Sequence, residues 1–443
     1  MTTDLPSIVH LYQQIVTAGL LQYLQNQAGM KVRCGIYSAR VVLWLMILQR
    51  LHAGATLAAT VQMLIQGAAG PLLQRCHRVR RGSISARTGA YCQARQKLPT
   101  LLCRQVTEEI IERLRQVLAS DGREPRNVFL LDGSSVELEH CRELLDGYPA
   151  AQNQHGKSHW PVLRIVVAHD ADTGMASSPY WGPMYGAAAV SEQELAEKAM
   201  AHLPAGSTVL GDRNFGVFWM AYAAQQRQLG VVLRLTETRA RKLGGIFSQP
   251  GERKVVWEAS RWDGGKRRHF AAGSIVAGRL IAARLGRGKS KQWLYLFTTL
   301  ALPLEEIVCI YGRRWNIETD LRSLKRTVNL HHISAKSQPM LEKELLIAMA
   351  AYNFVRAVMC MAARRSKIDP RQLSFAGVLN VVNYAWPKLI AAPTKQVHDQ
   401  EFFRVLDLAA QCILPKRSKR RSYPRQTWRR PKNFPIRASE KTK

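Results

Sequence analysis

The sequence is short of acidic residues, of paired cysteines and of long apolar runs. Its 443 residues hold 32 Asp and Glu against 64 Lys and Arg, a formal net charge of +32. The eight cysteines never form a Cys-x-x-Cys motif, which argues against a zinc ribbon or a disulfide scaffold. The longest apolar runs, Val41–Leu48 and Leu345–Ala351, are shorter than the roughly 20 residues that span a bilayer, and no signal peptide is visible. We therefore expect a cytoplasmic protein with no membrane partner.

Two common catalytic motifs are also missing. The sequence has no Gly-x4-Gly-Lys-Ser/Thr loop, which leaves an ATP-driven mechanism without support, and no Gly-x-Ser-x-Gly elbow for a serine nucleophile. Positive charge is abundant instead, on a chain with the 47% hydrophobic residues of a folded protein. Because a polyanion would balance this charge, DNA or RNA is the expected partner. The last 28 residues, from Lys416, contain twelve Lys or Arg and one Glu and are expected to contact phosphates nonspecifically.

The first part of the chain reads as helical. Apolar residues at helical spacing predict an all-helical N-terminal DNA-binding domain over residues 1–122, most clearly at Val106–Ala119. A basic, turn-rich stretch within it contains Arg87, Arg95 and Lys97. This stretch is compatible with a helix-turn-helix reader of the major groove and equally with a solvated basic face.

The pattern changes after a linker at residues 121–125. Short strands alternating with helices predict an α+β core whose first part covers residues 123–236, with a capping box at Ser191–Glu194. Strands separated by Gly-rich, charged turns predict a β-rich insertion over residues 237–302. The helical pattern returns over residues 303–395, the second part of the core, and a basic C-terminal tail covers residues 396–443.

Two aspartates occupy matching positions, each at the end of a short apolar strand. They are Asp132, after Val128–Leu131, and Asp212, after Ser207–Gly211. Neighbouring strands lie about 5 Å apart, so two such carboxylates can share divalent metal ions at a phosphodiester. Either aspartate taken alone is more often an ordinary turn residue.

A third pattern lies in the returning helix. Tyr311, Arg314, Glu318 and Lys325 are offset by 0, 3, 7 and 14 residues. At about 100° per residue they point to about 0°, −60°, −20° and −40°, one narrow helix face. A carboxylate flanked by a phenol, a guanidinium and an ammonium suits a metal-bound phosphodiester. The alternative is an ordinary charged helix face, which the two aspartates disfavour.

Together these residues resemble a known family. Asp132, the Asp212-Arg-Asn-Phe motif and the Tyr-x2-Arg-x3-Glu-x6-Lys pattern are similar to those of the DDE transposases of bacterial insertion sequences, and more narrowly of the insertion-sequence-four group. The resemblance covers roughly residues 83–365, and Asn214 stands where many relatives have Gly. It implies an RNase H-like mixed β-sheet core with flanking helices, interrupted by a β-rich insertion and preceded by an all-helical domain.

The resemblance also implies an activity, cut-and-paste transposition. Asp132, Asp212 and Glu318 would coordinate two Mg²⁺ ions, for which Mn²⁺ can substitute, and cleave the element ends. The freed 3′-hydroxyl would attack first the opposite strand, forming a hairpin, and then target DNA. The partners implied are double-stranded DNA (terminal inverted repeats and target) and a second copy of the chain in a homodimer, in a nucleoid-associated bacterial protein.

Further residues would hold the DNA. The resemblance implies that Tyr311, Arg314 and Lys325 bind the phosphates at the ends of the element. Trp315 is a candidate to stack on a flipped nucleotide, as are three tryptophans of the insertion, although a core role suits each of these better: Trp257, Trp262 and Trp293. Arg234 is expected either to reach a phosphate or to be a surface charge. Two other functions remain open: a catalytically inactive, repurposed DNA-binding protein, and an RNase H-like nuclease without strand transfer.

Overall fold

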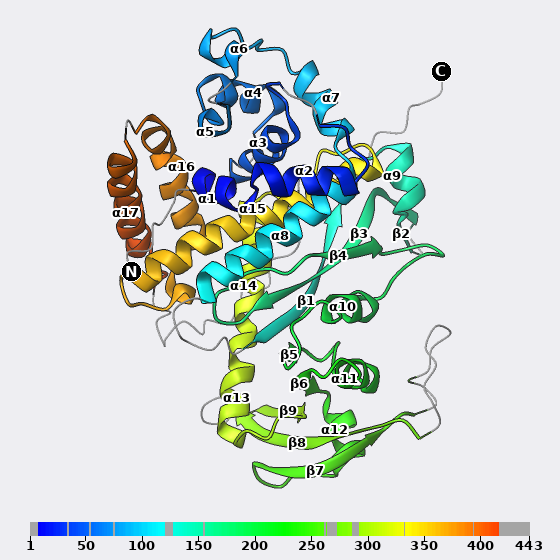
Figure 1. The fold of residues 1–443 in the computed structure, drawn as a ribbon. Coiled ribbons are helices and arrows are strands. Elements are labelled where there is room, and N and C mark those ends of the chain that lie inside the picture. Colours follow the sequence, from blue (N-terminus) through cyan, green and yellow to red (C-terminus); the bar gives the residue numbers. More distant parts are fainter. Residues whose placement is uncertain are drawn as a thin grey trace, which may run out of the picture.

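The computed structural model combines one large mixed β-sheet with helices on both of its faces and a helical layer at one end (Figure 1). It therefore has the α+β character expected from the sequence. The residues that the structure describes are 8–32, 35–52, 55–73, 76–119, 127–153, 156–260, 263, 273–285, 292–331, 333–392 and 394–415.

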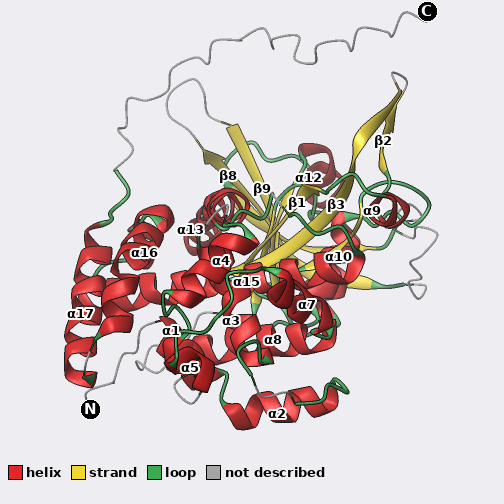
Figure 2. Cartoon of the chain, turned by 90° about the horizontal axis from the view of Figure 1, so that it is seen from above, coloured by secondary structure: helices red, strands yellow, loops and turns green. Residues whose placement is uncertain are grey.

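The described residues before position 120 are helical, as the apolar periodicity predicts. Their helices are α1 (Ile8–Ile15), α2 (Ala18–Gln27), α3 (Ala39–Leu51), α4 (Leu57–Ile65), α5 (Gly70–Leu73), α6 (His77–Arg80), α7 (Gly89–Lys97) and α8 (Thr100–Ala119). They share one hydrophobic core with three C-terminal helices, namely α15 (Gln338–Arg365), α16 (Phe375–Ala391) and α17 (Lys395–Gln411). Figure 2 shows this helical layer lying beside the sheet. Its status as a separate domain stays a prediction.

The helix α15 is the axis of that layer. It is the one described helix that is long and apolar enough to cross a membrane, and its most apolar window is completely buried inside the protein. Helices α3, α8 and α17 pack against it. Its apolar character therefore belongs to the shared core.

Nine strands form the sheet among the described residues. They are β1 (Val128–Glu137), β2 (Ala150–Asn153), β3 (Gly156–Asp170), β4 (Tyr180–Pro183), β5 (Thr208–Gly211), β6 (Gly230–Leu235), β7 (Gly251–Glu258), β8 (Ile275–Leu285) and β9 (Gln292–Thr298). Their order is β2-β3-β1-β5-β6-β9-β8-β7, with β4 also paired to β3. The β1–β5 and β5–β6 pairs are parallel, and the other pairs are antiparallel.

The strands expected in the insertion extend this same sheet. The edge of β6 pairs with β9, and β8 and β7 follow outward. The sequence pattern within this region predicts separate strands at residues 269–276 and 280–284, but β8 runs without interruption from Ile275 to Leu285; residues 264–272 lie outside the described part. The backbone hydrogen bonds of β9 therefore join the insertion directly to the central strands.

Each face of the sheet packs against its own helices (Figure 1). Side chains on one face, including Phe129 and Leu131, share a core with α10 (Glu192–Met200) and α11 (Phe218–Gln225). The opposite face, including Val128 and Leu130, packs against α13 (Leu304–Gly312) and α14 (Asn316–Arg322). The capping box expected at Ser191–Glu194 is confirmed at the start of α10. Two shorter helices, α9 (Arg142–Gly147) and α12 (Glu237–Gly244), complete the fold.

Candidate active site

Asp132, Asp212 and Arg234 come from three neighbouring strands. The parallel register pairs Leu130 of β1 with Leu210 of β5, and Gly211 of β5 with Leu233 of β6. Continued along each strand, this register aligns Asp132 with Asp212 and Asp212 with Arg234, at strand spacings of about 5 Å. Side chains alternate along a strand, so all three share the face of Leu130 and Leu210, the face that α13 and α14 cover.

The position of Asp132 differs from expectation in one respect. It lies in the middle of the ten-residue β1, whereas the sequence placed it at a strand end. Its neighbour β5 stops at Gly211, so β1 pairs with β5 only over Val128–Leu130. Beyond Leu130, β1 stays paired with β3 on one edge and has no strand partner among the described residues on the other. The gap beside Asp132 is opened by the end of β5. The expected adjacency of the two aspartates is retained for this reason.

The Tyr-Arg-Glu-Lys segment lies across this gap. Tyr311, at the end of α13, and Arg314 are both buried, and the Nε atom of Arg314 has no hydrogen-bond partner. The charge of Arg314 acts on Asp132 and on Tyr311, and Tyr311 also faces Arg234 and Asp212. The structure thus brings together two carboxylates, two guanidinium groups and a phenol.

Burial dominates the electrostatics of this group. Burial is the main reason that the pKa of Asp132 is raised to about 6; the negative charges of Glu192 and Asp212 also raise it, and a hydrogen bond from the Gly133 N–H (2.9 Å) and the charge of Arg314 act in the opposite direction. Burial likewise raises the pKa of Tyr311. Concentrated negative charge of this kind, supplied by hard oxygen donors, suits a divalent cation such as Mg²⁺.

The loop after β5 is folded tightly against the sheet. The Asn214 N–H donates to Oδ1 of Asp212 at 2.8 Å, which orients the carboxylate. At Gly216 a Cβ atom would lie 2.0 Å from the carbonyl oxygen of Arg234, so only glycine allows this approach. The Asp-Arg-Asn-Phe motif and the β6 arginine are therefore held in one arrangement.

Glu192 is a third acidic residue at this place, and by sequence it is only one residue of the capping box at Ser191–Glu194. Its carboxylate accepts a hydrogen bond from Nδ2 of Asn214 at 2.6 Å. Burial raises its pKa, and Asp212 raises it further. A carboxylate two residues before the capping Glu194 is an ordinary first-turn residue by pattern, so only the tertiary structure distinguishes it.

Glu318 and Lys325 lie further along the same segment. Glu318 is exposed on α14, one turn beyond Arg314, and α14 packs against β1. Lys325 is near Glu137 at the far end of β1, and burial lowers its pKa. Within the described residues, no three His, Cys, Asp or Glu side chains converge closely enough to hold a metal ion. The roles of Glu318 and Lys325 stay predictions.

The segment is not the single regular helix that the angular calculation assumed. A 3-10 turn at Arg313–Trp315 separates α13 from α14, and a π-helical turn at Ser323–Thr327 follows α14. These turns change the rotation per residue, so the four signature side chains leave the expected narrow stripe. Tyr311 and Arg314 therefore point into the protein while Glu318 is exposed.

A buried carboxylate fastens this segment to the helical layer. Asp320 of α14 is completely buried and accepts hydrogen bonds from Arg371 at 2.7 and 2.8 Å and from Arg356 of α15. Burial alone would raise the pKa of Asp320, but the two guanidinium groups hold it below its usual range. This ion-pair cluster positions α14 beside the aspartates.

The tryptophans divide into two groups. Trp315 is 62% exposed, with the Arg314 guanidinium 5.2 Å from its ring, and is therefore available to a nucleotide. Trp257 packs edge-on against Phe297, which supports its core role, and Trp293 stacks on Tyr295. Trp262 lies outside the described residues.

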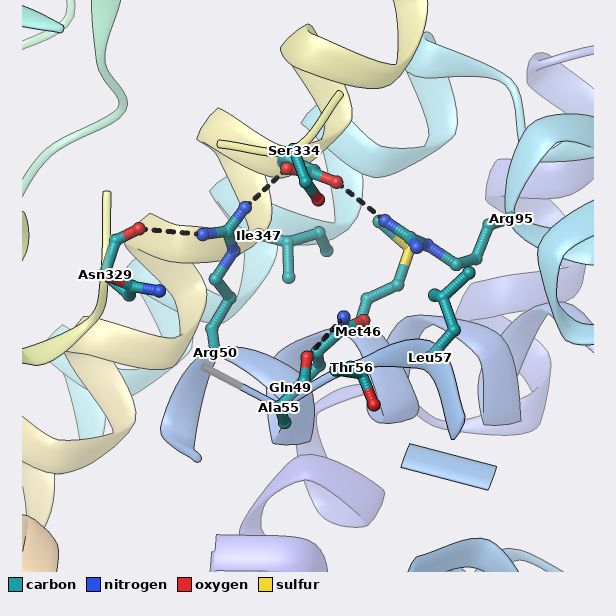
Figure 3. A pocket seen from close by; sticks show the side chains of 11 residues that line it. Met46, Gln49, Arg50, Ala55, Thr56, Leu57, Arg95, Asn329, Ser334 and Ile347 are labelled. Carbon is teal, nitrogen blue, oxygen red and sulfur yellow. Dashed lines mark hydrogen bonds and ion pairs between the residues drawn. The ribbon is translucent and has the colours of Figure 1, made fainter. Parts of the chain in front are cut away.

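A separate pocket of about 380 Å³, with a mixed polar and apolar lining, lies between the N-terminal helices and α15. Arg50 and Arg95 reach into it from opposite sides (Figure 3) and share the carboxylate of Glu344, at 2.6 and 2.7 Å. Arg50 also donates to the carbonyl oxygen of Asn329, just beyond the signature segment. Arg95, considered above as a groove-reading or solvated residue, is instead a buried structural residue; its sequence neighbourhood gave no sign of the distant Glu344.

The comparison with known proteins agrees with this geometry. A family model described as a transposase DDE domain matches residues 123–354, from before β1 into α15. The chain belongs to the DDE transposase family. It is also similar to the transposase InsG for insertion sequence element IS4 of Escherichia coli (strain K12), with 24% identity over 362 residues, 78% of this chain and 77% of that protein. The chain is therefore a DNA transposase of the DDE family, and its similarity to an IS4 transposase supports the insertion-sequence-four group that its signature residues indicate.

Proposed function

We propose that this transposase cuts and joins DNA by metal-assisted chemistry in which Asp132, Asp212 and Glu318 hold the metal ions. The observation that carries the proposal is the side-by-side position of Asp132 and Asp212 beneath the signature segment. DDE transposases generally use divalent ions, and Mg²⁺, with Mn²⁺ as a substitute, matches carboxylate donors. Asp132, Asp212 and Glu318 would hold a pair of such ions, whose chemistry would be to lower the pKa of a water or 3′-hydroxyl and to neutralise charge on the leaving oxygen of a phosphodiester.

The surrounding side chains suit a DNA phosphate. Arg314 is buried with an unpartnered Nε, and Arg234 lies on the next strand beside Asp212. A guanidinium can donate two hydrogen bonds to one phosphate, so these residues would orient the scissile bond, with Tyr311 between them. Lys325 would bind a phosphate further along the strand, and the exposed Trp315 would stack on a displaced base.

The topology supports the expected RNase H-like core. The strand order β4-β3-β1-β5-β6, with parallel β1, β5 and β6 and antiparallel β3, places both aspartates at the point where β1 and β5 separate. We assign residues 123–236 and 303–395 to this core, residues 237–302 to its insertion, and residues 1–122 to additional DNA contacts. The tail predicted over residues 396–443 begins later than expected, because α17 (Lys395–Gln411) packs in the helical core, so only the residues after α17 are assigned to DNA contacts. The partners would be inverted-repeat and target DNA and a second copy of the chain, in the cytoplasm at the nucleoid.

Purified protein and a DNA that carries the flanking inverted repeats test this proposal. With Mg²⁺, the wild type should release the element by double-strand breaks and join it to target DNA. Asp132→Ala, Asp212→Ala and Glu318→Ala should each bind the ends but cut more than about 100-fold more slowly, beyond the usual loss for an outer-shell group. Asp146→Asn, an exposed carboxylate on α9, is the control. Undiminished cleavage by any of the three alanine variants would remove that residue from the assignment.

A further inference from the structure

Glu192 lies where the two aspartate motifs meet, but it reaches them from the other side of the sheet. Asp132 shares a face with Leu130, which packs under α13 and α14, whereas α10 packs on the face of Phe129 and Leu131. Side-chain alternation directs the next residue, Gly133, toward α10. Glu192 stands at the first turn of α10, directly against this glycine.

The absence of a side chain at Gly133 admits the Glu192 carboxylate. A Cβ atom at Gly133 would lie 2.1 Å from Oε1 of Glu192, so the carboxylate occupies the space that any other residue would fill. The N–H of Gly133 lies close enough to stabilise the charge of Glu192, and it also donates to Oδ1 of Asp132 at 2.9 Å. One backbone amide thus serves the carboxylates on both faces of β1.

The second motif is connected in the same way. The side-chain amide of Asn214 donates to Oε2 of Glu192 at 2.6 Å, while the backbone amide of Asn214 donates to Asp212 at 2.8 Å. The adjacent Gln193 donates to the carbonyl oxygen of Asn214 at 2.6 Å. The first turn of α10 is therefore hydrogen-bonded to both the side chain and the backbone of Asn214 in the loop after β5.

We propose that Glu192 is a positioning residue for the reaction: it braces the Asp132 and Asp212 backbones against each other and thereby sets the metal requirement of the site. This inference rests on the metal-assisted function proposed above. Glu192 touches Gly133 and Asn214 and acts through them, in the manner of the outer-shell partners that orient metal ligands. The Asn214 side chain, which donates to Glu192, shares this positioning role.

The test is a metal titration of end cleavage by the full-length protein. Glu192→Ala should cut 10–100-fold more slowly at low Mg²⁺, about the cost of losing an outer-shell partner. The isosteric Glu192→Gln should need a several-fold higher Mg²⁺ concentration for half-maximal cleavage, and excess Mg²⁺ or Mn²⁺ should restore its rate. End binding without metal should stay unchanged in both. Glu197→Gln, on the same helix but paired with Arg227 at the surface, is the matched control.

A double variant separates the brace from a general loss of stability. If the amide of Asn214 acts through Glu192, Glu192→Ala combined with Asn214→Ala should cut no more slowly than Glu192→Ala alone. Wild-type rates and an unshifted metal requirement in both Glu192 variants would overturn the brace while leaving metal-dependent cleavage intact. A wild type that cuts nothing with any divalent metal would overturn the proposed function itself.

Discussion

At the scale of single residues, the site contains charged groups whose partial burial lowers the stability of the folded chain. Asp132 is partly buried beside Asp212 and Glu192, and its pKa is raised to about 6. A carboxyl whose pKa is higher in the folded than in the unfolded state destabilises the fold once it ionises. Function and stability therefore oppose each other at this position.

Replacing Asp132 by Asn should stabilise the metal-free protein while abolishing cleavage. The shift from the usual 3.8 to about 6 corresponds to about 3 kcal/mol, which partial solvent exposure reduces to about 1–2 kcal/mol. The wild type bears this penalty fully above pH 6 and loses it as the pH falls toward 3.8. Denaturant unfolding in EDTA should therefore show the gain at pH 8 and little of it at pH 4.

The comparison with Asp146→Asn controls for the loss of one surface charge, because Asp146 is 75% exposed by its side chain. If Asp132→Asn unfolds at the wild-type denaturant concentration at pH 8, the carboxylate is less desolvated than its surroundings indicate.

At the scale of elements, the sequence predicted what depends on local pattern. The capping box at Ser191–Glu194 and the strand preceding Asp212 need only neighbouring residues, and both are confirmed. The break in the signature helix was missed. Asp320 lies in α14 between the 3-10 and π turns and is bound by residues 36 and 51 positions away. Ion pairs of that range leave no local signal.

Glu192 was missed for the same reason. Its partners Gly133 and Asn214 lie on two other elements, and only the register of β1 with β5 brings them to the start of α10. The joining of the insertion to β6 through β9 is likewise a nonlocal pairing. The local sequence pattern predicts which segments are strands, but it does not predict the order in which they pair.

Asp320 should be essential to the element that carries Glu318. Asp320→Asn leaves Arg356 and Arg371 without their buried partner and should lower the free energy of unfolding by about 3–5 kcal/mol at pH 7. Because the folded-state pKa is depressed, the wild-type advantage should persist above pH 4 and shrink as the pH falls below the usual value of 3.8. Urea unfolding across this range measures it.

Glu305→Gln, an exposed change in the first turn of α13, is the control for that series. Equal stability of Asp320→Asn and Glu305→Gln would show that the guanidinium groups do not depend on Asp320. Cleavage should be measured below the melting temperature of each variant, so that a loosened α14 is separated from an unfolded chain.

At the scale of the whole molecule, positive charge is spread well beyond the site. The net charge is +32, of which the last 28 residues contribute twelve cationic side chains and one anionic one. Internally, Arg50, Glu344 and Arg95 tie the N-terminal helices to α15, while Arg50 also meets the end of the signature segment at Asn329. The N-terminal helices are thus connected to the signature segment through these polar contacts.

Removing residues 416–443 should make DNA binding less sensitive to salt. Each phosphate contact releases a counterion, so a plot of log affinity against log salt concentration should become less steep by about 0.9 per lost contact. Binding measured by gel shift or fluorescence anisotropy between about 50 and 200 mM salt, over which affinity falls by orders of magnitude, gives both slopes. An identical slope for the full-length and shortened chains would mean that these residues do not touch DNA.

The pairing of β9 with β6 has a mechanical meaning. Leu296 of β9 is the register partner of Arg234 of β6, and β8 and β7 extend outward from β9. The outer strands are therefore joined to the strand that carries Arg234 by a continuous ladder of pairing. If Arg234 orients the scissile phosphate as proposed, a force that DNA exerts on the far edge of the sheet would be transmitted to that phosphate through paired backbone and not through a flexible loop.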